Sequence, residues 1–530
     1  MNRFLFLAVL ALIPSISQIR AQQSIEITPL PGEYWWGGAV GVGEEMPFTR
    51  KFGEYNLAFQ SSNNQVVPLL LSNRGRYVWS DMPIRFSVAD SGEITVSSDY
   101  EKPELTVGGS TLREAFNAAC NAHFPPSGLL PDSLFFSSPQ YNTWIELMYN
   151  QNQDDILKYA RSIVENRFPT GVLMIDDNWM NYYGSFSFKS DKFPNPKAMT
   201  AELHRLGFKV MLWICPFVSP DSPEYRTLAE KGFLIKSRNG RPAIFNWWNG
   251  QSACYDFTNP AAADWFVETL KKFQAEYGID GFKFDAGDNS FYYSPNLVSY
   301  RKDAVSVTHT EAWVRIGLNF PFNEYRAGWR MGGQALVQRL GDKNYSWDAV
   351  QSLIPQMVAA GLLGYAYVCP DMIGGGNFVT FLNVDEDKFD QALIVRSAQV
   401  HALMPMMQFS VAPWRILSAE NLEIVRQAAL LHRQFGGYIL ACARESAKTG
   451  EPIVRNMEYA FPGQGFALVN DQFMLGEKYL VAPVVTKDNF RAVKLPKGAW
   501  KDDLGKVYKG DRTVKIEVPL NRLPYFEKIK

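Results

Sequence analysis

The sequence lacks any strong bias of charge. Its 530 residues include 53 basic and 54 acidic side chains, for a formal net charge of -1, and no block of like charges interrupts the chain. Such a chain has no electrostatic feature that would draw it to nucleic acid or to an anionic membrane. A neutral partner molecule fits this composition better.

Cysteine and long apolar runs are also scarce. The five cysteines are widely spaced and form no CxxC pair, which argues against both a disulfide scaffold and a zinc site. We expect most of them to be buried, with Cys215 and Cys254 as the one candidate pair if the protein is exported. No later segment approaches the roughly 18 consecutive apolar residues of a membrane span.

The N-terminus has the features of a targeting segment. A positive charge at Arg3 precedes an apolar stretch that ends near Ile16, and the small residue Ala21 follows before a polar segment. Residues 1–22 therefore predict a signal peptide and a periplasmic or secreted protein. A retained N-terminal anchor is the alternative, because Ile19 is imperfect for the residue three before the cut.

Three regions with different patterns follow this segment. Short β-rich runs separated by turns predict an antiparallel sandwich over residues 24–124, and a similar pattern predicts a second sandwich over residues 460–530. Between them, over residues 135–455, short apolar strands alternate with helical patterns. The predicted strands of this region are WIELMY, GVLMID, KVMLWIC, GFKFD, LNFPFN, ALVQRL, GYAYVC and LMPMMQF. Eight βα units predict an α/β fold, a (β/α)8 TIM barrel flanked by the two sandwiches.

Carboxylates follow several of these strands. In a parallel barrel, catalytic groups stand at the carboxyl ends of the strands, so these residues are the candidates for chemistry. They are Asp176, Asp177, Asp285, Asp288, Asp342 and Asp371. A single strand-end carboxylate is commonly a helix cap or a solvated loop residue, but a group of this size indicates one shared site.

The run GFKFDAGD, at residues 281–288, is the most informative of these strand ends. Alternate residues of a strand face the same side, so Lys283 and Asp285 are expected to point together into the barrel mouth. Lys283 would favour the ionised form of Asp285, which a carboxylate nucleophile needs. A buried ion pair with a purely structural role is the alternative interpretation.

Hydrolysis of a glycosidic bond commonly uses two carboxyl groups, one as nucleophile and one as acid/base. Asp342, in the run GDKNYSW, is the candidate partner. Tyr345 and Trp347 are expected to give Asp342 a less polar environment that raises its pKa. The alternative is a loop residue that caps the helix beginning near Trp347.

From about Leu69 to its end, the chain resembles glycoside hydrolase family 31. The resemblance rests on GFKFDAGD together with LLSNRGRYVW, FPNPKAMTAELHRLGFKVMLWICPF, YDFTNPAAADWF and QFMLGEKYLVAPVV. It implies that Asp285 is the nucleophile and Asp342 the acid/base. By position, it also implies contacts with the sugar from Asp176, Asp177, Trp213, Trp247, Trp248, Lys283, Arg326 and Asp371. It implies no metal and no organic cofactor.

The sequence departs from the family pattern at three places. Gln408 and Ser410 stand where members that act on glucose usually carry an Arg and a His, PDMIGGG is one residue longer than the common form, and Asp288 replaces a common Glu. These features resemble the branch that includes α-galactosidases. The expected activity is therefore exo-acting, retaining α-galactoside hydrolysis. An α-glucosidase, an α-xylosidase, a transglycosylase and a sugar-binding protein without activity are the alternatives.

Overall fold

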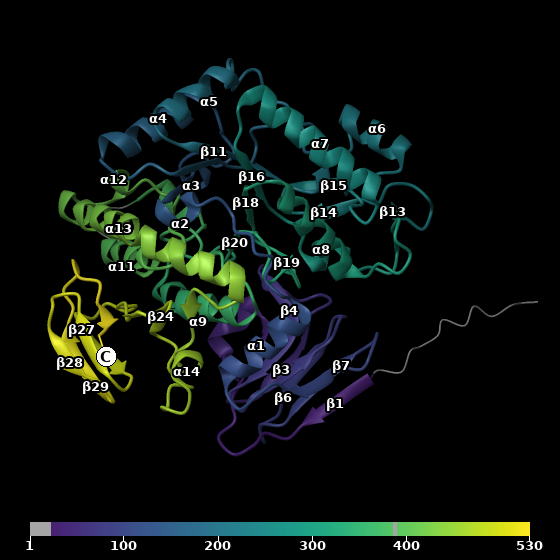
Figure 1. The fold of residues 1–530 in the computed structure, drawn as a ribbon. Coiled ribbons are helices and arrows are strands. Elements are labelled where there is room, and N and C mark those ends of the chain that lie inside the picture. The colour runs from purple at the N-terminus through teal and green to yellow at the C-terminus, as the bar shows by residue number, and fades with distance from the viewer. Residues whose placement is uncertain (1–22, 385–388, 530) are drawn as a thin grey trace, which may run out of the picture.

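The computed structural model describes residues 23–384 and 389–529, arranged as a parallel barrel with one β-rich domain before it and one after it in the chain; both lie below the barrel in the view of Figure 1. The predicted signal peptide lies outside the described residues. None of the helices in the described ranges is both long and apolar enough to cross a membrane.

The N-terminal domain contains two sheets. One has the strand order β1-β7-β6-β3, and the other has the order β19-β4-β5-β8, with β2 also paired to β4. The strands are β1 Gln23–Ile27, β2 Trp35–Ala39, β3 Phe52–Asn56, β4 Gln65–Ser72, β5 Arg76–Trp79, β6 Arg85–Val88, β7 Ile94–Ser98, β8 Glu104–Val107 and β19 Gly328–Trp329. Since β19 belongs to the barrel region and pairs with β4, the two domains share a sheet.

The helix α1, Leu112–His123, was not anticipated from the sequence. It packs against β4 and β5 of the N-terminal domain. Its start carries a capping box, in which Thr111 accepts a hydrogen bond from the backbone N–H of Glu114 and the Glu114 carboxylate accepts one from the backbone N–H of Thr111. This motif is a recognisable helix signal in the sequence.

The barrel predicted from the strand count is confirmed. Eight strands form one parallel sheet in the order β21-β20-β18-β16-β11-β10-β9-β22, and a parallel bridge between Met372 and Gln408 joins its two ends. The strands are β9 Gln140–Asn142, β10 Val172–Ile175, β11 Lys209–Ile214, β16 Gly281–Phe284, β18 Phe322–Tyr325, β20 Gln338–Arg339, β21 Val368–Cys369 and β22 Gln408–Phe409.

Helices surround this sheet (Figure 1). They include α4 Gln153–Glu165, α5 Pro196–Arg205, α7 Pro260–Tyr277, α8 Ser306–Ile316, α9 Trp347–Leu362, α11 Gln391–Ala402 and α13 Ala419–Thr449. The sequence predicts the limits of α7, because Asn259 is a typical N-cap residue and Gly278 a typical helix end. Both are confirmed: Asn259 accepts from the Ala261 N–H, and Gly278 ends the helix in a left-handed conformation at φ 71°. Phe266, Leu270 and Phe273 of its apolar stripe are buried.

One predicted strand was misplaced, and four others, LNFPFN, ALVQRL, GYAYVC and LMPMMQF, begin later than expected. WIELMY is not the first barrel strand, because Trp144–Leu147 form the short helix α3 and the strand β9 precedes it. The apolar residues of this run follow a helical spacing rather than strict alternation, which explains the error. The predicted LNFPFN strand begins later than expected, at Phe322.

The expected pairing of Cys215 with Cys254 is also wrong, since all five cysteines are free and buried. The hairpin of β12 (Phe217–Val218) with β15 (Gly250–Cys254) places Cys254 opposite Phe217 rather than opposite Cys215.

The C-terminal domain has an apolar core of its own around Trp500. The N-terminal domain and the barrel share one continuous core, to which Phe473, Leu475 and Val481 of the C-terminal domain also belong. Its sheets have the orders β23-β24-β25-β30-β27-β28 and β26-β29. The strands are β23 Val454–Arg455, β24 Phe473–Leu475, β25 Tyr479–Val481, β26 Phe490–Leu495, β27 Ala499–Asp502, β28 Val507–Lys509, β29 Arg512–Glu517 and β30 Tyr525–Lys528.

The close contact between β16 and β18 gives a test of the barrel. A methyl group on Gly281 would lie 2.0 Å from the carbonyl oxygen of Phe322, so Gly281→Ala should force the two strands apart. We expect a loss of about 2 kcal/mol or more in the free energy of unfolding, measured by denaturant melts. Gly437, in α13, has open space around it, and Gly437→Ala should stabilise by about 0.5–1 kcal/mol. Equal effects of the two substitutions would contradict this account of the barrel.

Candidate active site

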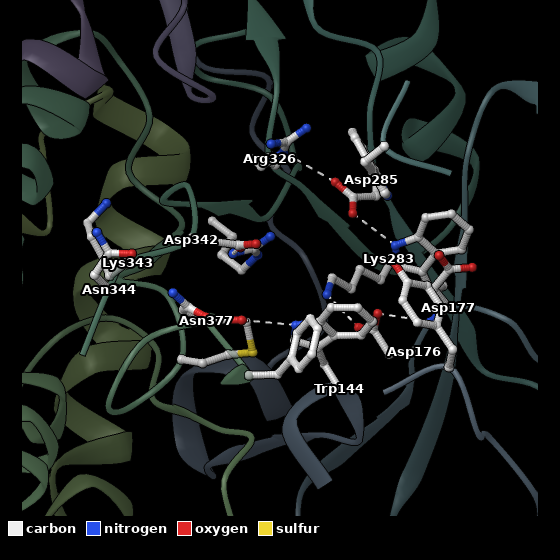
Figure 2. Close-up of a pocket in the computed structure, with 17 residues that line it drawn as sticks. Trp144, Asp176, Asp177, Lys283, Asp285, Arg326, Asp342, Lys343, Asn344 and Asn377 are labelled. Carbon is white, nitrogen blue, oxygen red and sulfur yellow. Dashed lines mark hydrogen bonds and ion pairs between the residues drawn. The ribbon is translucent and has the colours of Figure 1, made fainter. Parts of the chain in front are cut away.

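A pocket of about 360 Å³ opens at the carboxyl ends of the barrel strands (Figure 2). It is lined by charged and aromatic side chains from at least five of the βα units. The lining residues are Trp144, Tyr149, Asp176, Asp177, Trp213, Trp248, Lys283, Asp285, Arg326, Arg339, Asp342, Lys343, Asn344, Met372, Gly376, Asn377 and Phe378. Four of the six carboxylates expected at one site, Asp176, Asp177, Asp285 and Asp342, therefore line the pocket, whereas Asp288 and Asp371 do not.

Asp285 follows β16, and its carboxylate is held on both oxygens. Oδ2 accepts a hydrogen bond from Trp213 Nε1 at 2.9 Å, and Oδ1 accepts one from the Ala286 N–H at 2.8 Å. The Nε atom of Arg326 lies 3.2 Å from Oδ1. Burial would raise the pKa of this carboxyl, but Arg326, followed by Lys283, outweighs it and lowers the pKa below its ordinary range.

A left-handed backbone turn follows the carboxylate. Ala286 and Gly287 have φ values of 57° and 79°. A methyl group on Gly287 would lie 2.2 Å from the Trp313 ring, so only glycine fits there. The turn lets the Ala286 N–H point back at Asp285, and glycine at position 287 permits this sharp change of direction.

Lys283 faces the pocket as predicted, but Asp285 is not its direct partner. Its Nζ lies 2.6 Å from Oδ2 of Asp176, which also accepts from Asn142 Nδ2 at 2.8 Å. Arg326 is the cation in direct contact with Asp285, and its Nη2 donates to Asp288 at 2.7 Å. The expected effect of Lys283 on Asp285 is therefore present, but it is secondary to that of Arg326.

Asp342 lies across the pocket from Asp285, with 52% of its side chain exposed (Figure 2). Its Oδ1 accepts a hydrogen bond from Arg339 Nη1 at 2.7 Å. Desolvation in the pocket would raise the pKa of Asp342, but Arg339, with Arg326 and Lys283, holds it far below its ordinary range. The free pocket therefore contains the ionised carboxylate.

The expected raised pKa of Asp342 is thus wrong, because Arg339 lowers it and the two aromatic residues thought to surround it bind Asp390 instead. The Trp347 Nε1 atom donates to Oδ2 of Asp390 at 3.0 Å, and the Tyr345 hydroxyl donates to the Asp390 carbonyl at 2.7 Å. These bonds tie the loop after Asp342 to the start of α11.

Asp371 is fully buried beneath the pocket and does not line it. Its Oδ1 accepts from Arg339 Nη1 at 2.8 Å, and its Oδ2 accepts from the Lys343 N–H at 2.8 Å. Burial raises the pKa of Asp371 to about 6, against the effect of Arg339. In this arrangement Asp371 supports the loop that carries Asp342, and the predicted contact with sugar stays a prediction.

Asp177 belongs to a hydrogen-bonded group at the pocket rim. It accepts from the Tyr183 hydroxyl at 3.1 Å and from Asn249 Nδ2 at 2.5 Å, while the Tyr149 hydroxyl donates to Asn249 Oδ1 at 3.0 Å. Burial, followed by the charge of Asp176, raises the pKa of Asp177 to about 7. The arrangement fixes the hairpin of β14 (Phe245–Trp247) and β15 at the rim.

The three predicted tryptophans have different positions. Trp213 is buried and lines the pocket, and Trp247 lies behind it with the rings parallel and their centroids 6.5 Å apart. Trp248 lines the pocket with 46% of its surface exposed and lies 5.3 Å from the Arg326 guanidinium. Trp213 and Trp248 are thus available to a ligand, whereas Trp247 supports them.

Sequence reasoning missed two parts of the site. Trp144 and Tyr149 were assigned to a strand, although they form a wall of the pocket with Phe378. Arg339 was seen only as part of a strand, and a charged residue at the end of a barrel strand was the available signal. Among the described residues, no group of three His, Cys, Asp or Glu side chains could hold a metal ion.

Comparisons with known proteins agree with this geometry. Residues 139–440 match the model of the glycosyl hydrolases family 31 TIM-barrel domain, and residues 450–529 match that of the family 31 C-terminal domain. A solved α-xylosidase of family 31 from a soil metagenome, complexed with xylose, superposes with a TM-score of 0.82 at 21% identity, covering 96% of this chain and 79% of that chain. This similarity supports the fold.

Curated relatives are longer than this chain. The myogenesis-regulating glycosidase of Mus musculus is 32% identical over 80% of this chain and 61% of its own length. The alpha-glucosidase 2 of Bacillus thermoamyloliquefaciens is 27% identical over 71% of this chain and 51% of its own length. The chain therefore spans about half to three-fifths of these relatives.

The raised pKa of Asp177 predicts a dependence of stability on pH. The folded protein holds this proton more tightly than the unfolded chain, so Asp177 makes stability fall as pH rises from its unfolded pKa of about 4 to about 7. Asp177→Asn cannot titrate, so its Tm should fall less than that of the wild type between about pH 5 and about pH 8. Calorimetry measures the fall in Tm between the two pH values for each protein. An equal fall in the wild type and in Asp177→Asn would contradict the raised pKa of Asp177.

Proposed function

The family model covers more than half of the chain, so this protein belongs to glycoside hydrolase family 31, and we propose that it is a retaining α-glycosidase. The observation that carries the proposal is the pair of carboxylates, Asp285 and Asp342, that face one pocket in different surroundings. Asp285 is rigidly held and ionised, as a nucleophile must be. Asp342 is half exposed, as a group that exchanges protons with substrate and water must be.

The proposed reaction is a double displacement. Asp342 first takes up a proton from solvent. Asp285 then attacks the anomeric carbon while Asp342 gives this proton to the departing oxygen, which leaves a glycosyl ester on Asp285. Asp342, now ionised, takes a proton from water, and that water breaks the ester and releases the sugar with its α configuration retained. Arg339 favours the ionised form of Asp342 that the second step needs.

Other lining residues suit recognition of a sugar. Asp176 and Lys283 offer an acceptor and a donor for hydroxyl groups, while Trp213 and Trp248 offer aromatic surfaces for the apolar face of a ring. The site is a pocket rather than a long groove, which supports release of one terminal sugar from an oligosaccharide or glycoside.

We further propose galactose as that sugar. Gln408 and Ser410 occupy the place of the usual glucose-binding pair, but both are buried away from the pocket. Gln408 donates to Gln140 and Glu324, and the Ser410 Oγ atom accepts from the Ile145 N–H. Glucose and galactose differ only at C4, so this change in polar groups supports a change of sugar.

A panel of nitrophenyl α-glycosides tests both the retaining mechanism and the choice of galactose as the sugar. We expect turnover of the α-galactoside to exceed that of the α-glucoside and the α-xyloside, and we expect proton NMR to show the α anomer as the first product. Preference for another sugar would overturn galactose alone. A β anomer as first product would overturn the retaining mechanism.

Removal of the nucleophile should abolish turnover. We expect Asp285→Ala to lower kcat by roughly 10⁴-fold on a nitrophenyl glycoside, because no other carboxylate can replace Asp285 at its position. Circular dichroism provides the control for folding. Activity close to that of the wild type in the folded variant would contradict the assignment of Asp285.

Arg339 should set the upper pH limit of the reaction. Proton donation needs protonated Asp342, and Arg339 lowers the pKa of this group. Arg339→Gln should therefore move the basic limb of the kcat/KM profile to higher pH. Arg301→Gln, which changes an exposed arginine paired with Asp303, should leave the profile unchanged. A basic limb that stays in place in Arg339→Gln would contradict this role.

A further inference from the structure

The N-terminal domain reaches the active site through the turn at residues 61–65. Ser62 and Asn63 adopt left-handed conformations with φ of 51° and 57°, and Asn64 and Gln65 are buried. Consecutive non-glycine residues in this region of backbone space persist only where their surroundings hold them. The contacts of this turn with the rest of the protein therefore hold it in its strained conformation.

Asn64 contacts the end of the strand that carries the acid/base. Its Oδ1 accepts a hydrogen bond from the Gly341 N–H at 2.7 Å, and its Nδ2 donates to the Ser62 carbonyl at 2.7 Å. Gly341 directly precedes Asp342 and lies beyond the last paired residue of β20, Arg339. Asn64 thus fixes the backbone from which Asp342 projects.

The turn and the strand end are also in close steric contact. A methyl group on Gly341 would lie 2.8 Å from the Asn63 carbonyl oxygen. Gln65, which follows Asn64 in the turn, also contacts this strand end. Its Nε2 atom donates to the carbonyl of Arg339 at 3.1 Å and to that of Arg326 at 2.5 Å. The same turn therefore touches the chain on both sides of Leu340.

We propose that Asn64 is a positioning residue for Asp342, so that the N-terminal domain takes part in proton transfer. This inference rests on the proposed glycosidase function. Asn64 acts only through the backbone of Gly341 and does not line the pocket. Without its acceptor, the Gly341 N–H loses its partner and the carboxylate of Asp342 loses its fixed direction.

Substrates with different leaving groups distinguish a role of Asn64 in proton transfer from a general effect on the structure. A dinitrophenyl group departs without a proton, whereas a methoxy group needs the proton of Asp342. The test compares kcat/KM for the methyl and the dinitrophenyl α-glycosides of the sugar that the wild type cleaves. The ratio of the two constants does not depend on how much of a variant is folded.

For Asn64→Ala we expect kcat/KM on the methyl glycoside to fall by about 10- to 100-fold and that on the dinitrophenyl glycoside by less than about threefold. Asn64→Ser, whose shorter side chain cannot reach Gly341, should show the same selectivity if the alanine variant does not fold. Asn64→Asp keeps the oxygen that accepts from Gly341 but loses the donor to the Ser62 carbonyl, so its ratio should lie between those of Asn64→Ala and the wild type.

Ser306→Ala is the matched control. The Ser306 hydroxyl donates to the Ala58 carbonyl at 2.5 Å, so this variant also removes a buried hydrogen bond between the two domains. It lies away from the acid/base strand and should leave the ratio unchanged.

Equal losses on both substrates in Asn64→Ala, or no loss on either, would overturn the positioning role while leaving the glycosidase function intact. A wild type that cleaves neither substrate would overturn the proposed function, and the inference with it.

Discussion

The rest of the structure depends on one constraint. Several carboxylates converge on the barrel mouth, and their negative charges must be compensated. Burying several negative charges together is costly unless cations and hydrogen bonds compensate them. Three buried cations do so here, and one of them, Arg339, joins carboxylates from three chain segments. The ion pairs are Lys283 with Asp176, Arg326 with Asp285 and Asp288, and Arg339 with Glu324, Asp342 and Asp371.

This shared set of cations gives similar carboxylates different properties. Asp285 has both oxygens occupied and 14% of its side chain exposed, whereas Asp342 has one direct cation and is open to the pocket. Asp177 has no cation in direct contact among the described residues, and burial raises its pKa to about 7. The chemistry proposed for each group follows from its neighbours rather than from its type.

The N-terminal domain has a larger part in the site than its sequence indicates. Its β-rich pattern contains no obvious chemistry, yet it shares a sheet with β19 and a continuous core with the barrel. Asn64 and Gln65 contact the backbone under Arg326, Arg339 and Asp342. The domain boundary therefore does not separate the catalytic part of the molecule from the rest.

The sequence by itself determined whatever depends on local pattern: the barrel from repeated strands, the limits of α7 from Asn259 and Gly278, and the shared face of Lys283 and Asp285 from strand alternation. Only the tertiary structure decided the partners of each charge. Asp176 forms an ion pair with Lys283, and Asp285 forms one with Arg326. Tyr345 and Trp347 donate hydrogen bonds to Asp390. These pairings depend on distances between residues far apart in the chain. Sequence pattern and periodicity describe only neighbouring residues and carry no information on such distances.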